Sequence, residues 1–587
     1  MILEKHTAIS RTVTSIVILV VLVVAAAGIY FVTTSGTPSS STSTSSSSTP
    51  TSSVSTTSTT SSSVTTSLTT STSSVYTTSS STGATVLNFQ VAQAFGTLDP
   101  AVGNDYTQFA ANVNMYDDLL TQQPNGAVLP NLAYKWTTSA DGLTWVFDIN
   151  STVKFHNGDL LTAADVVWSM QRELAVNQGF AWLWTTVLTS SSVTALNSTA
   201  VQFVLNKPYS PFFGSLSLFF VVDKNLVMQH LTNVTASNPN GDWGVGWLTT
   251  NDAGSGPYSL QNWQRDVTLT LTRFPGYWKG WGSNPDPYQT VVYQVITSDA
   301  TVLSLAKSGQ LQVVGQYVAV PTYQSLKAMG WTWGIYPSAN IFDLKMNMQS
   351  PPLDNIYLRK AISYAFNYSA IPVILPGAVQ SQGPVANSYQ YHDPNVFTYS
   401  YNPTSAKAML AQSGLQASSI TLTIVYVSGN TPEQQIALEF QKDMQQVLGI
   451  TVNIVPQTWQ TITELAAHPN TTPQITEVYY DPLYPDTDTF FYPMYDTVSN
   501  GTWISMEWMN NATINNLIAQ ERATTDTTQR QQIFYQLQND IVSISPDVFV
   551  FNQPYYNARA PTVGGYTFYN GMSFDYAQYP YYYNANG

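Results

Sequence analysis

Three aspartates in one proline-rich segment are the residues of this chain whose type and spacing come closest to a chemical function. Asp481, Asp486 and Asp488 lie in YDPLYPDTD, where two carboxylates could cleave a glycoside or several could bind calcium. Aspartates in such loops also cap turns by accepting backbone N–H groups. We expect these three to cap turns, and a surface glycosidase remains the alternative.

The other reactive side chains form no catalytic or metal-binding pattern. The sequence has no cysteine and no H-E-x-x-H or G-x-S-x-G motif, and GVGWL at 244–248 lacks the lysine of a phosphate loop. The histidines are scattered singly, at His6, His156, His230, His392 and His468. We therefore predict no enzymatic activity, no catalytic residues, no metal site and no cofactor, with His156 as a hydrogen-bonding residue of a turn.

Aromatic side chains are the positive indication of binding. Trp, Tyr and Phe make up 13% of the chain. Aromatic faces stack on sugar rings and also form apolar walls for peptide side chains. Many of these residues will pack in the core, and the sequence does not separate them from residues of a binding cleft.

The segment Val153 to Met170 shows how the chain builds the supporting elements. Val153 and Phe155 alternate with polar residues as in a half-buried strand, and Asn157-Gly158 is typical of a tight turn. Thr162 is then expected to cap a helix, with Asp165 in its first turn. This segment is scaffold rather than site.

That segment also carries a family resemblance. It is similar to K-F-H-x-G-x-x-x-T-A-x-D-V-x-x-S of the family 5 extracellular solute-binding proteins, the peptide, nickel and oligosaccharide receptors of ABC importers. The resemblance covers almost everything after about residue 85. Further blocks follow in the family's order: LDP at 98–100, YDDLL at 116–120, LPNLAYKWTTSADGLTWVFDI at 129–149, GSGPYSL at 254–260, PPLDNIYLRKAISYAFNYSAI at 351–371, YNPTSAKAMLAQSGL at 401–415 and YPDTDTF at 484–490.

The resemblance implies an α/β fold of two lobes, the large class II periplasmic-binding-protein type with an inserted subdomain. The expected parts are lobe I at 85–115, 251–340 and 547–587, the inserted subdomain at 116–250, and lobe II at 341–546. The chain would cross between the lobes near Ile335 to Asn347 and near Pro546 to Pro554. Within lobe II, strands at 420–426 and 450–456 flank a helix at 433–448 that ends at Gly449, which predicts a parallel pair.

The resemblance also points to a binding segment. Peptide-binding members share a motif like G-W-x-x-D-x-x-D-P, whose first Asp pairs with the peptide's α-ammonium, and here Leu483 occupies that position. A buried ammonium without a counter-ion is costly, so either the ligand lacks a free amino terminus or Asp481 or Asp488 substitutes. This favours an oligosaccharide without excluding an oligopeptide. The predicted ligand-binding residues are Phe95, Thr97, Asp99, Tyr106, Trp459, Tyr480, Leu483, Tyr484 and Asp486.

The first part of the chain predicts a tether. Residues 1–15 contain Lys5 and Arg11 and precede an uncharged apolar run, Ile16 to Val32, that is long enough to span a membrane with the body outside. A cleaved signal segment is the alternative. Residues 33–84 are almost wholly Ser and Thr and should form a disordered or glycosylated stalk. The absence of cysteine excludes a lipid-modified cysteine, and the combination resembles archaeal surface-binding proteins.

The surface composition is unusual. Charged residues are 9% of the chain, against about 25% in typical domains, which would suit either an acidic exterior or any low-charge glycosylated surface. Seven N-x-S/T sequons suit a glycoprotein, and the net charge of −14 argues against nucleic-acid binding. We predict a monomeric cell-surface receptor that closes around an oligopeptide or oligosaccharide and delivers it to ABC permease subunits. A surface-layer or adhesion protein that retains the fold is the rival.

Overall fold

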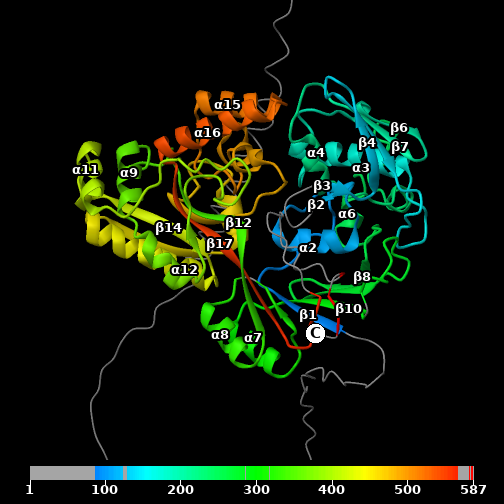
Figure 1. The fold of residues 1–587 in the computed structure, drawn as a ribbon, viewed down its shortest axis with the longest axis horizontal. Coiled ribbons are helices and arrows are strands. Elements are labelled where there is room, and N and C mark those ends of the chain that lie inside the picture. The colour runs from blue at the N-terminus through cyan, green and yellow to red at the C-terminus, as the bar shows by residue number, and fades with distance from the viewer. Residues whose placement is uncertain are drawn as a thin grey trace, which may run out of the picture. The chain divides into compact units, whose positions relative to one another are not determined.

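The computed structural model describes residues 86–122, 128–284, 286–315, 317–565, 581 and 583–585. Eleven strands of these residues form one sheet (Figure 1), and all lie within a single compact unit of the chain. In order, the strands are β15 (Thr451–Gln457), β14 (Thr421–Val427), β16 (Ile475–Tyr480), β12 (Thr332–Met346), β17 (Asp547–Arg559), β11 (Val313–Val314), β1 (Val86–Val91), β10 (Thr290–Val295), β9 (Thr268–Arg273) and β8 (Tyr258–Gln264), with β13 (Val379–Gln380) paired to β17.

Lobe I is built on the end of the sheet that contains β1. Strand β1 runs parallel to β10 on one side and to β11 on the other. Its residues Leu87, Phe89 and Val91 are buried at alternate positions, as expected for a strand that packs helices on its faces. The lobe's helices are α2 (Tyr106–Met115), α7 (Asp299–Lys307) and α8 (Val320–Ala328).

Lobe II is built on the other end, where β14 pairs in parallel with both β15 and β16. The predicted parallel pair is therefore confirmed. The predicted helix between the pair begins after the N-cap Asn430 and ends at Gly449, which adopts a left-handed φ of 72°. The lobe's helices are α9 (Ile356–Ala365), α10 (Ile371–Ile374), α11 (Pro403–Ser413), α12 (Thr431–Asp443), α13 (Trp459–Leu465), α14 (Tyr492–Tyr495), α15 (Ala512–Ala523) and α16 (Thr527–Ile544).

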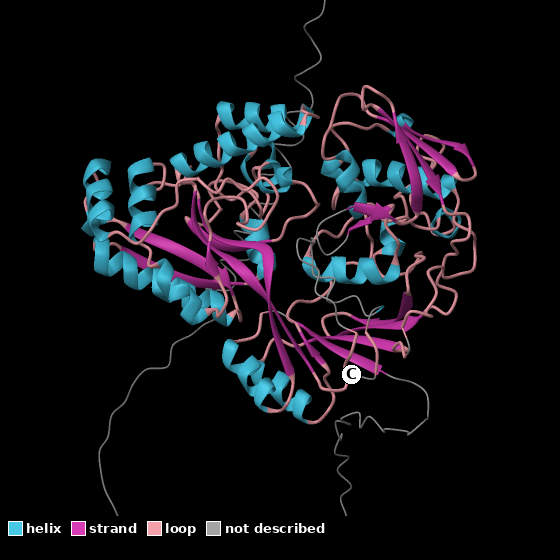
Figure 2. Cartoon of the chain, in the orientation of Figure 1, coloured by secondary structure: helices cyan, strands magenta, loops and turns pink. Residues whose placement is uncertain are grey.

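Two long antiparallel strands, β12 and β17, run through both lobes (Figure 2). The first part of β12, Thr332 to Pro337, pairs with 554–559 of β17, and its last part, Ile341 to Lys345, pairs with 547–552. Between them the register shifts at 338–340, where the Ser338 hydroxyl donates to the Gln553 carbonyl at 2.5 Å and accepts from the Asn340 N–H at 3.2 Å. The β-bulge therefore marks the passage between the lobes.

A separate four-stranded sheet forms the core of the inserted subdomain. Its strands, in spatial order, are β4 (Ala133–Thr138), β5 (Thr144–Ile149), β7 (Ala200–Val204) and β6 (Val193–Asn197), and a small hairpin of β2 (Leu120–Gln122) and β3 (Val128–Pro130) lies outside it. The subdomain's helices are α3 (Ala163–Val176), α4 (Phe212–Ser215), α5 (Lys224–Met228) and α6 (Val245–Leu248).

The Val153 to Met170 segment fits its predicted role with one correction. Thr162 caps α3, and Asp165 completes a capping box with it. The predicted strand at Val153 and Phe155 is wrong, because the chain turns back at once and forms only an isolated bridge between Lys154 and Leu160. Within this turn the Phe155 N–H bonds to the Asp159 carbonyl at 2.9 Å, which leaves no length for a strand.

His156 in the same turn fastens the segment to lobe I. Its Nδ1 lies 2.9 Å from Asp252 Oδ2, and its Nε2 lies 2.9 Å from the Gly256 carbonyl. Both partners accept hydrogen bonds, so both ring nitrogens must carry protons. Burial alone lowers the pKa of His156, but the Asp252 carboxylate and the Gly256 carbonyl outweigh it and raise that pKa above its ordinary value. The predicted hydrogen-bonding role is confirmed.

The predicted membrane segment, Ile16 to Val32, and the predicted stalk lie outside the described residues. Among the residues that are described, no helix combines the length and hydrophobicity that a membrane span requires.

Candidate functional site

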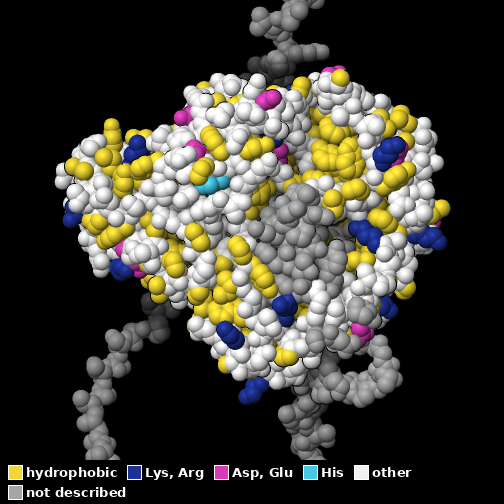
Figure 3. All heavy atoms as spheres, viewed as in Figure 1, with side chains coloured by type: hydrophobic (Ala, Val, Ile, Leu, Met, Phe, Trp, Pro, Cys, Tyr) yellow, Lys and Arg dark blue, Asp and Glu magenta, His cyan; other side chains and the backbone are white. Residues whose placement is uncertain are grey.

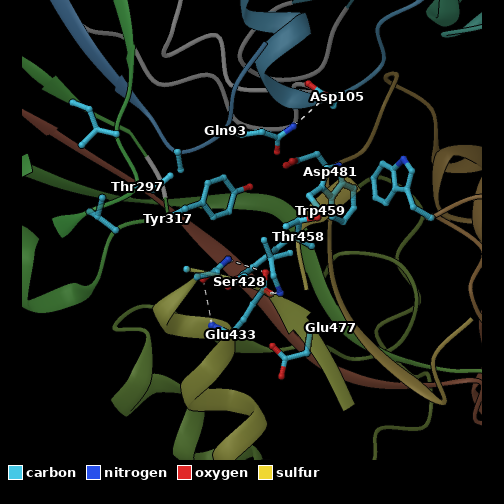
Figure 4. A pocket seen from close by; sticks show the side chains of 18 of the residues that line it. Gln93, Asp105, Thr297, Tyr317, Ser428, Glu433, Thr458, Trp459, Glu477 and Asp481 are labelled. Carbon is cyan, nitrogen blue, oxygen red and sulfur yellow. Dashed lines mark hydrogen bonds between the residues drawn. The ribbon is translucent and has the colours of Figure 1, made fainter. Parts of the chain in front are cut away.

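A cavity of about 380 Å³ (Figure 4) opens between the carboxyl ends of two sets of three parallel strands, one set in each lobe, that run in opposite directions in the sheet. From lobe I it is lined by residues just after β1, β10 and β11, and from lobe II by residues at the ends of β14, β15 and β16. Open α/β sheets bind ligands at this position, since the loops that follow the strands are free to vary. The cavity is therefore the candidate ligand site.

One strand supplies the polar floor of the cavity. Glu477 and Tyr479 lie two residues apart on β16, and Asp481 follows at the next alternate position. Alternate residues of a strand point to the same face, so all three side chains line the cavity. Leu483, in the loop after the strand, lines the cavity beside these three residues.

Aromatic rings from both lobes approach each other across the cavity. Tyr317 of lobe I lies 5.7 Å from Tyr479 of lobe II, measured between ring centroids, at 63°. On the lobe II side Trp459 packs edge-on against Trp503 at 5.1 Å. Tyr317 holds a left-handed φ of 70°, a conformation that is unfavourable for a residue other than glycine and that clusters at functional sites.

The lobe I wall carries a carboxylate fixed in place by its own helix. Asp105 is the N-cap of α2, and its Oδ1 accepts the N–H groups of Thr107 at 3.0 Å and Gln108 at 3.1 Å. Its Oδ2 accepts Gln93 Nε2 at 3.2 Å, and both side chains face the cavity (Figure 4). Asp105 is thus held by four donors, one of which is the Thr107 hydroxyl at 2.9 Å.

Burial makes the lobe II carboxyl groups weak acids. It raises the pKa of Asp481 to about 7, against a smaller opposing effect of a hydrogen bond from Asn340. Burial raises the pKa of Glu433 to about 8, although the Val427 N–H and Asn430 bond to it. Burial and the neighbouring Glu433 together raise the pKa of Glu477 well above its ordinary value. Asp481 and Glu433 are therefore poised to exchange protons near neutrality.

Of the predicted ligand-binding residues, Trp459 and Leu483 line the cavity. Trp459 starts helix α13 directly after β15, which directs it toward the strand ends. Leu483 is almost fully buried, and its N–H bonds to Thr489 Oγ1 at 2.8 Å, so the loop conformation fixes its position.

Phe95, Thr97 and Asp99, predicted from lobe I, are not among the described lining residues of the cavity. Phe95 is buried against Tyr293, with ring centroids 5.9 Å apart. Asp99 forms a buried ion pair with Arg172 of α3, and its N–H bonds to Thr97 Oγ1 at 3.1 Å. Tyr106 begins α2, and its side chain lies outside the described part of the structure.

The other residues predicted from lobe II form an interior network. The Tyr480 hydroxyl donates to the Thr489 carbonyl at 2.6 Å, and the Tyr484 hydroxyl donates to Asp488 Oδ2 at 2.6 Å. Asp486 accepts both terminal nitrogens of Arg530 of α16, at 2.6 and 2.7 Å. These contacts give the three residues a role in holding the loop after β16 together and onto α16.

Sequence reasoning missed most of the lining residues that the structure brings together, among them Asp105, Tyr317, Glu433, Glu477 and Trp503. The alternation on β16 could have indicated Glu477, because it lies four residues before Asp481 in a strand-like run. No local signal indicated Tyr317 or Trp503, which reach the cavity from loops.

Comparison with known proteins gives one family and one fold. The family model described as bacterial extracellular solute-binding proteins, family 5 middle, matches residues 127–502. A probable D,D-dipeptide-binding periplasmic protein, DdpA, of Escherichia coli K12 is 26% identical over 492 residues, covering 80% of this chain and 89% of that protein. The dipeptide-binding protein of the same organism is 27% identical over 490 residues, covering 78% and 88%.

The fold is shared with a solved structure of the same class. The periplasmic binding protein DppA from Helicobacter pylori, in complex with the peptide STSA, matches with a TM-score of 0.74 and 21% identity, covering 86% of this chain and 98% of that one. At this identity the match shows the two-lobed α/β fold alone.

Proposed function

Because the chain belongs to the family 5 extracellular solute-binding proteins, we propose that it is the substrate-binding receptor of an ABC importer and captures an oligopeptide between its lobes. It is a solute-binding protein and not an enzyme. The named relatives bind dipeptides or peptides, which supports a peptide ligand here.

One observation carries the proposal: the cavity is walled by both lobes, and β12 and β17 run from one lobe to the other. A ligand that contacts both walls stabilises the closed arrangement over the open one, so binding and closure are coupled. The bulge at 338–340 is the proposed hinge. Closure needs no bond to break, which agrees with a receptor.

Asp481 is the proposed partner of the peptide's α-ammonium. The position that carries an Asp in peptide-binding members is Leu483 here, and Asp481 lines the same wall two residues earlier. Its bond from Asn340 ties it to the proposed hinge. An ammonium at Asp481 would therefore contact the segment where the lobes join.

An oligosaccharide is the second candidate ligand. Four aromatic side chains line the cavity, and such rings stack on sugar faces. They are Tyr317, Trp459, Tyr479 and Trp503.

We further propose that the receptor works at the cell surface as a monomer. Its partners would be ABC permease subunits, and Ile16 to Val32 would anchor it in the cytoplasmic membrane through the Ser/Thr-rich stalk. We also propose that its N-x-S/T sequons are glycosylated and that the protein is archaeal.

Thermal-shift measurement against panels of oligopeptides and oligosaccharides tests the ligand class. A ligand at one hundred times its Kd adds about 2.7 kcal/mol to the free energy of unfolding, which raises the melting temperature visibly. Trp459→Ala should reduce the shift, whereas Gln460→Ala, an exposed neighbour on α13, should not. Shifts with sugars alone would replace the peptide proposal by the oligosaccharide one. No shift with either panel would favour the surface-layer or adhesion role.

A further inference from the structure

The cavity is lined by four carboxyl groups and, among its described lining residues, by no lysine, arginine or histidine. The four are Asp105 from lobe I and Glu433, Glu477 and Asp481 from lobe II. A positively charged group of a solute would find partners on both walls. A carboxylate of a solute would find none of these lining side chains to neutralise it, and each lining carboxyl group that is ionised would repel it.

Glu477 differs from the other three carboxyl groups because it lacks a partner. It is fully buried on the central part of β16, and neither of its carboxyl oxygens has a hydrogen-bond partner among the described residues. By contrast, Glu433 accepts the Val427 N–H at 2.6 Å and Asn430 Nδ2 at 2.7 Å, and Asp105 caps α2. A buried polar group without a partner is unfavourable, so Glu477 is a vacant acceptor at the floor of the cavity.

The spacing along β16 sets the distance between the acidic positions Glu477 and Asp481. Glu477 and Asp481 are four residues apart and share one face of the strand, so their Cα atoms are on the order of 13 Å apart at the usual strand rise. Figure 4 shows Glu477 and Glu433 at one end of the cavity and Gln93 and Asp105 at the other. Tyr479 lies between Glu477 and Asp481 on the strand, where its ring can cover an aliphatic chain or contact a cation.

We propose that this cavity selects cationic solutes, namely oligopeptides with lysine or arginine side chains, and that Glu477 receives the basic side chain while Asp481 receives the α-ammonium. The proposal rests on the peptide-receptor function above and specifies its ligand class. In this arrangement Glu433 is a positioning residue that holds the loop at 428–430 and α12.

The raised pKa values on the cavity floor lead to a second prediction, the release of a proton when a basic peptide binds. Burial raises the pKa of Glu433 to about 8 and that of Glu477 well above its ordinary value, which favours the protonated form of both groups while the floor is empty. A lysine ammonium against Glu477 favours the ionised carboxylate. Binding of a lysine peptide should therefore release a proton to the buffer, and binding of an alanine peptide should not release it from this group.

Isothermal titration of the full-length chain at pH 7 tests both consequences. The probes are tetralysine, tetraalanine, tetraglutamate and spermine, each in two buffers with different ionisation enthalpies. We expect tetralysine to bind at least about tenfold more tightly than tetraalanine, with tetraglutamate weakest. Proton release, read from the buffer dependence of the enthalpy, should be greater for tetralysine than for tetraalanine, because both peptides place an α-ammonium at Asp481 but only tetralysine places a cation at Glu477.

Glu477→Gln is the informative variant, and Glu464→Gln, an exposed glutamate of α13, is the matched control. Glu477→Gln should lower the tetralysine-to-tetraalanine affinity ratio by about tenfold and reduce the proton release with tetralysine to that with tetraalanine. Glu464→Gln should behave as the wild type. A thermal melt checks that each variant folds, and the wild-type proton release tests the proposal even if Glu477→Gln does not fold.

The outcomes separate the two proposals. Equal affinity for tetralysine and tetraalanine would overturn cation selection and leave the peptide receptor standing. An equal loss in Glu477→Gln and Glu464→Gln would also overturn it, because the preference would then come from the overall charge of −14. Failure of all three peptides would overturn the peptide receptor, and Glu477-dependent binding of spermine alone would then support a cation site for a solute that is not a peptide.

Discussion

Leu483 and Asp481 stand two residues apart on one wall of the cavity, and between them they determine how a peptide's amino terminus could be held. Leu483 is apolar and nearly fully buried, so it offers an ammonium no counter-charge. Asp481 offers one, but burial raises its pKa to about 7, so the carboxylate is only half ionised at neutrality when the cavity is empty. Recognition at this wall should therefore depend on pH.

Replacing Leu483 by Asp should increase affinity for peptides with a free amino terminus. The new carboxylate would lie on the cavity wall, where the family motif has its Asp. The measurement compares a tetrapeptide with its N-acetylated form by calorimetry, and the free form should gain about tenfold. Leu465→Asp, at a partly exposed position of α13, is the control. An equal gain for the acetylated peptide would show that the register is wrong.

Affinity for tetraalanine should rise as the pH increases from 5 to 7. Asp481 has its pKa raised to about 7, so it is mostly neutral at pH 5 and ionises across this window, while the peptide's α-ammonium stays charged below about 7.7. The slope should approach tenfold per pH unit at the acidic end and should be largely lost in Asp481→Asn. An unchanged slope in Asp481→Asn would assign the titration to Asp105, Glu433 or Glu477, which line the same cavity.

At the residue scale the resemblance located two lining residues, Trp459 and Leu483, and it also selected several interior ones. Tyr480 is a neighbour of the lining residues in sequence but faces the opposite side of β16, which the alternation of a strand explains. Asp99 and Asp486 looked available as binding groups. Their partners Arg172 and Arg530 lie 73 and 44 residues away, and only the tertiary fold brings such pairs together.

At the scale of elements, the pair of strands β12 and β17 joins the strands of the two lobes into one sheet. Pro337 faces Pro554 across the pair at the position where the register shifts. Proline lacks an N–H group and cannot donate to the ladder, so the pair is locally weak where it passes between the lobes. Ser338 supplies bonds there that the prolines cannot.

Ser338→Ala should destabilise the chain. It removes the donor to the Gln553 carbonyl and the acceptor for the Asn340 N–H, both in a buried segment, at a cost of about 1–3 kcal/mol. Urea unfolding measures the loss of unfolding free energy. Ser325→Ala on α8, whose hydroxyl is exposed, should change it little. A Ser338→Ala variant as stable as Ser325→Ala would mean that the bulge does not depend on this hydroxyl.

Helices and strands with long periodic patterns were predictable, and short ones were not. The helix after Asn430 and its flanking parallel strands show apolar periodicity and a glycine end signal over many residues. The alternation at Val153 to Phe155 covers only three residues, and the local turn to Leu160 overrides it. The boundaries of β12 depend on pairing with a strand two hundred residues later, which no local pattern encodes.

For the whole molecule, scarce surface charge contrasts with a concentration of acids in the interior. Figure 3 shows a face dominated by uncharged polar and hydrophobic side chains. Inside lobe II, Lys345 is fully buried and forms an ion pair with Glu507, while Tyr495 donates to Asp547 Oδ2 at 2.7 Å. Burial, together with the charge of Asp547, raises the pKa values of Glu507 and Asp343 well above their ordinary values.

The melting temperature should be at least as high at pH 4.5 as at pH 7.5. The carboxyl groups of Asp343 and Glu507 have a higher pKa in the folded chain than in the unfolded chain. The stability that each contributes is complete below the unfolded pKa, near 4, and is lost as the pH rises through the folded pKa. His156, whose pKa is also raised, acts in the same direction. Differential scanning calorimetry measures the trend, and Glu507→Gln should flatten it. A collapse of the melting temperature between pH 6 and pH 4 would contradict both this expectation and an acidic exterior.

At the six strand ends around the cavity, the hydrogen-bonded sheet gives way to the loops that line the site. The sheet's hydrogen bonds lie within the strands, so the short loops after β1, β10, β11, β14, β15 and β16 can vary without altering the ladder. A receptor of this design can change its ligand selectivity through a few substitutions in these loops. Engineering its selectivity should begin with those six connections and with Glu477 of β16, and should leave the two crossing strands intact.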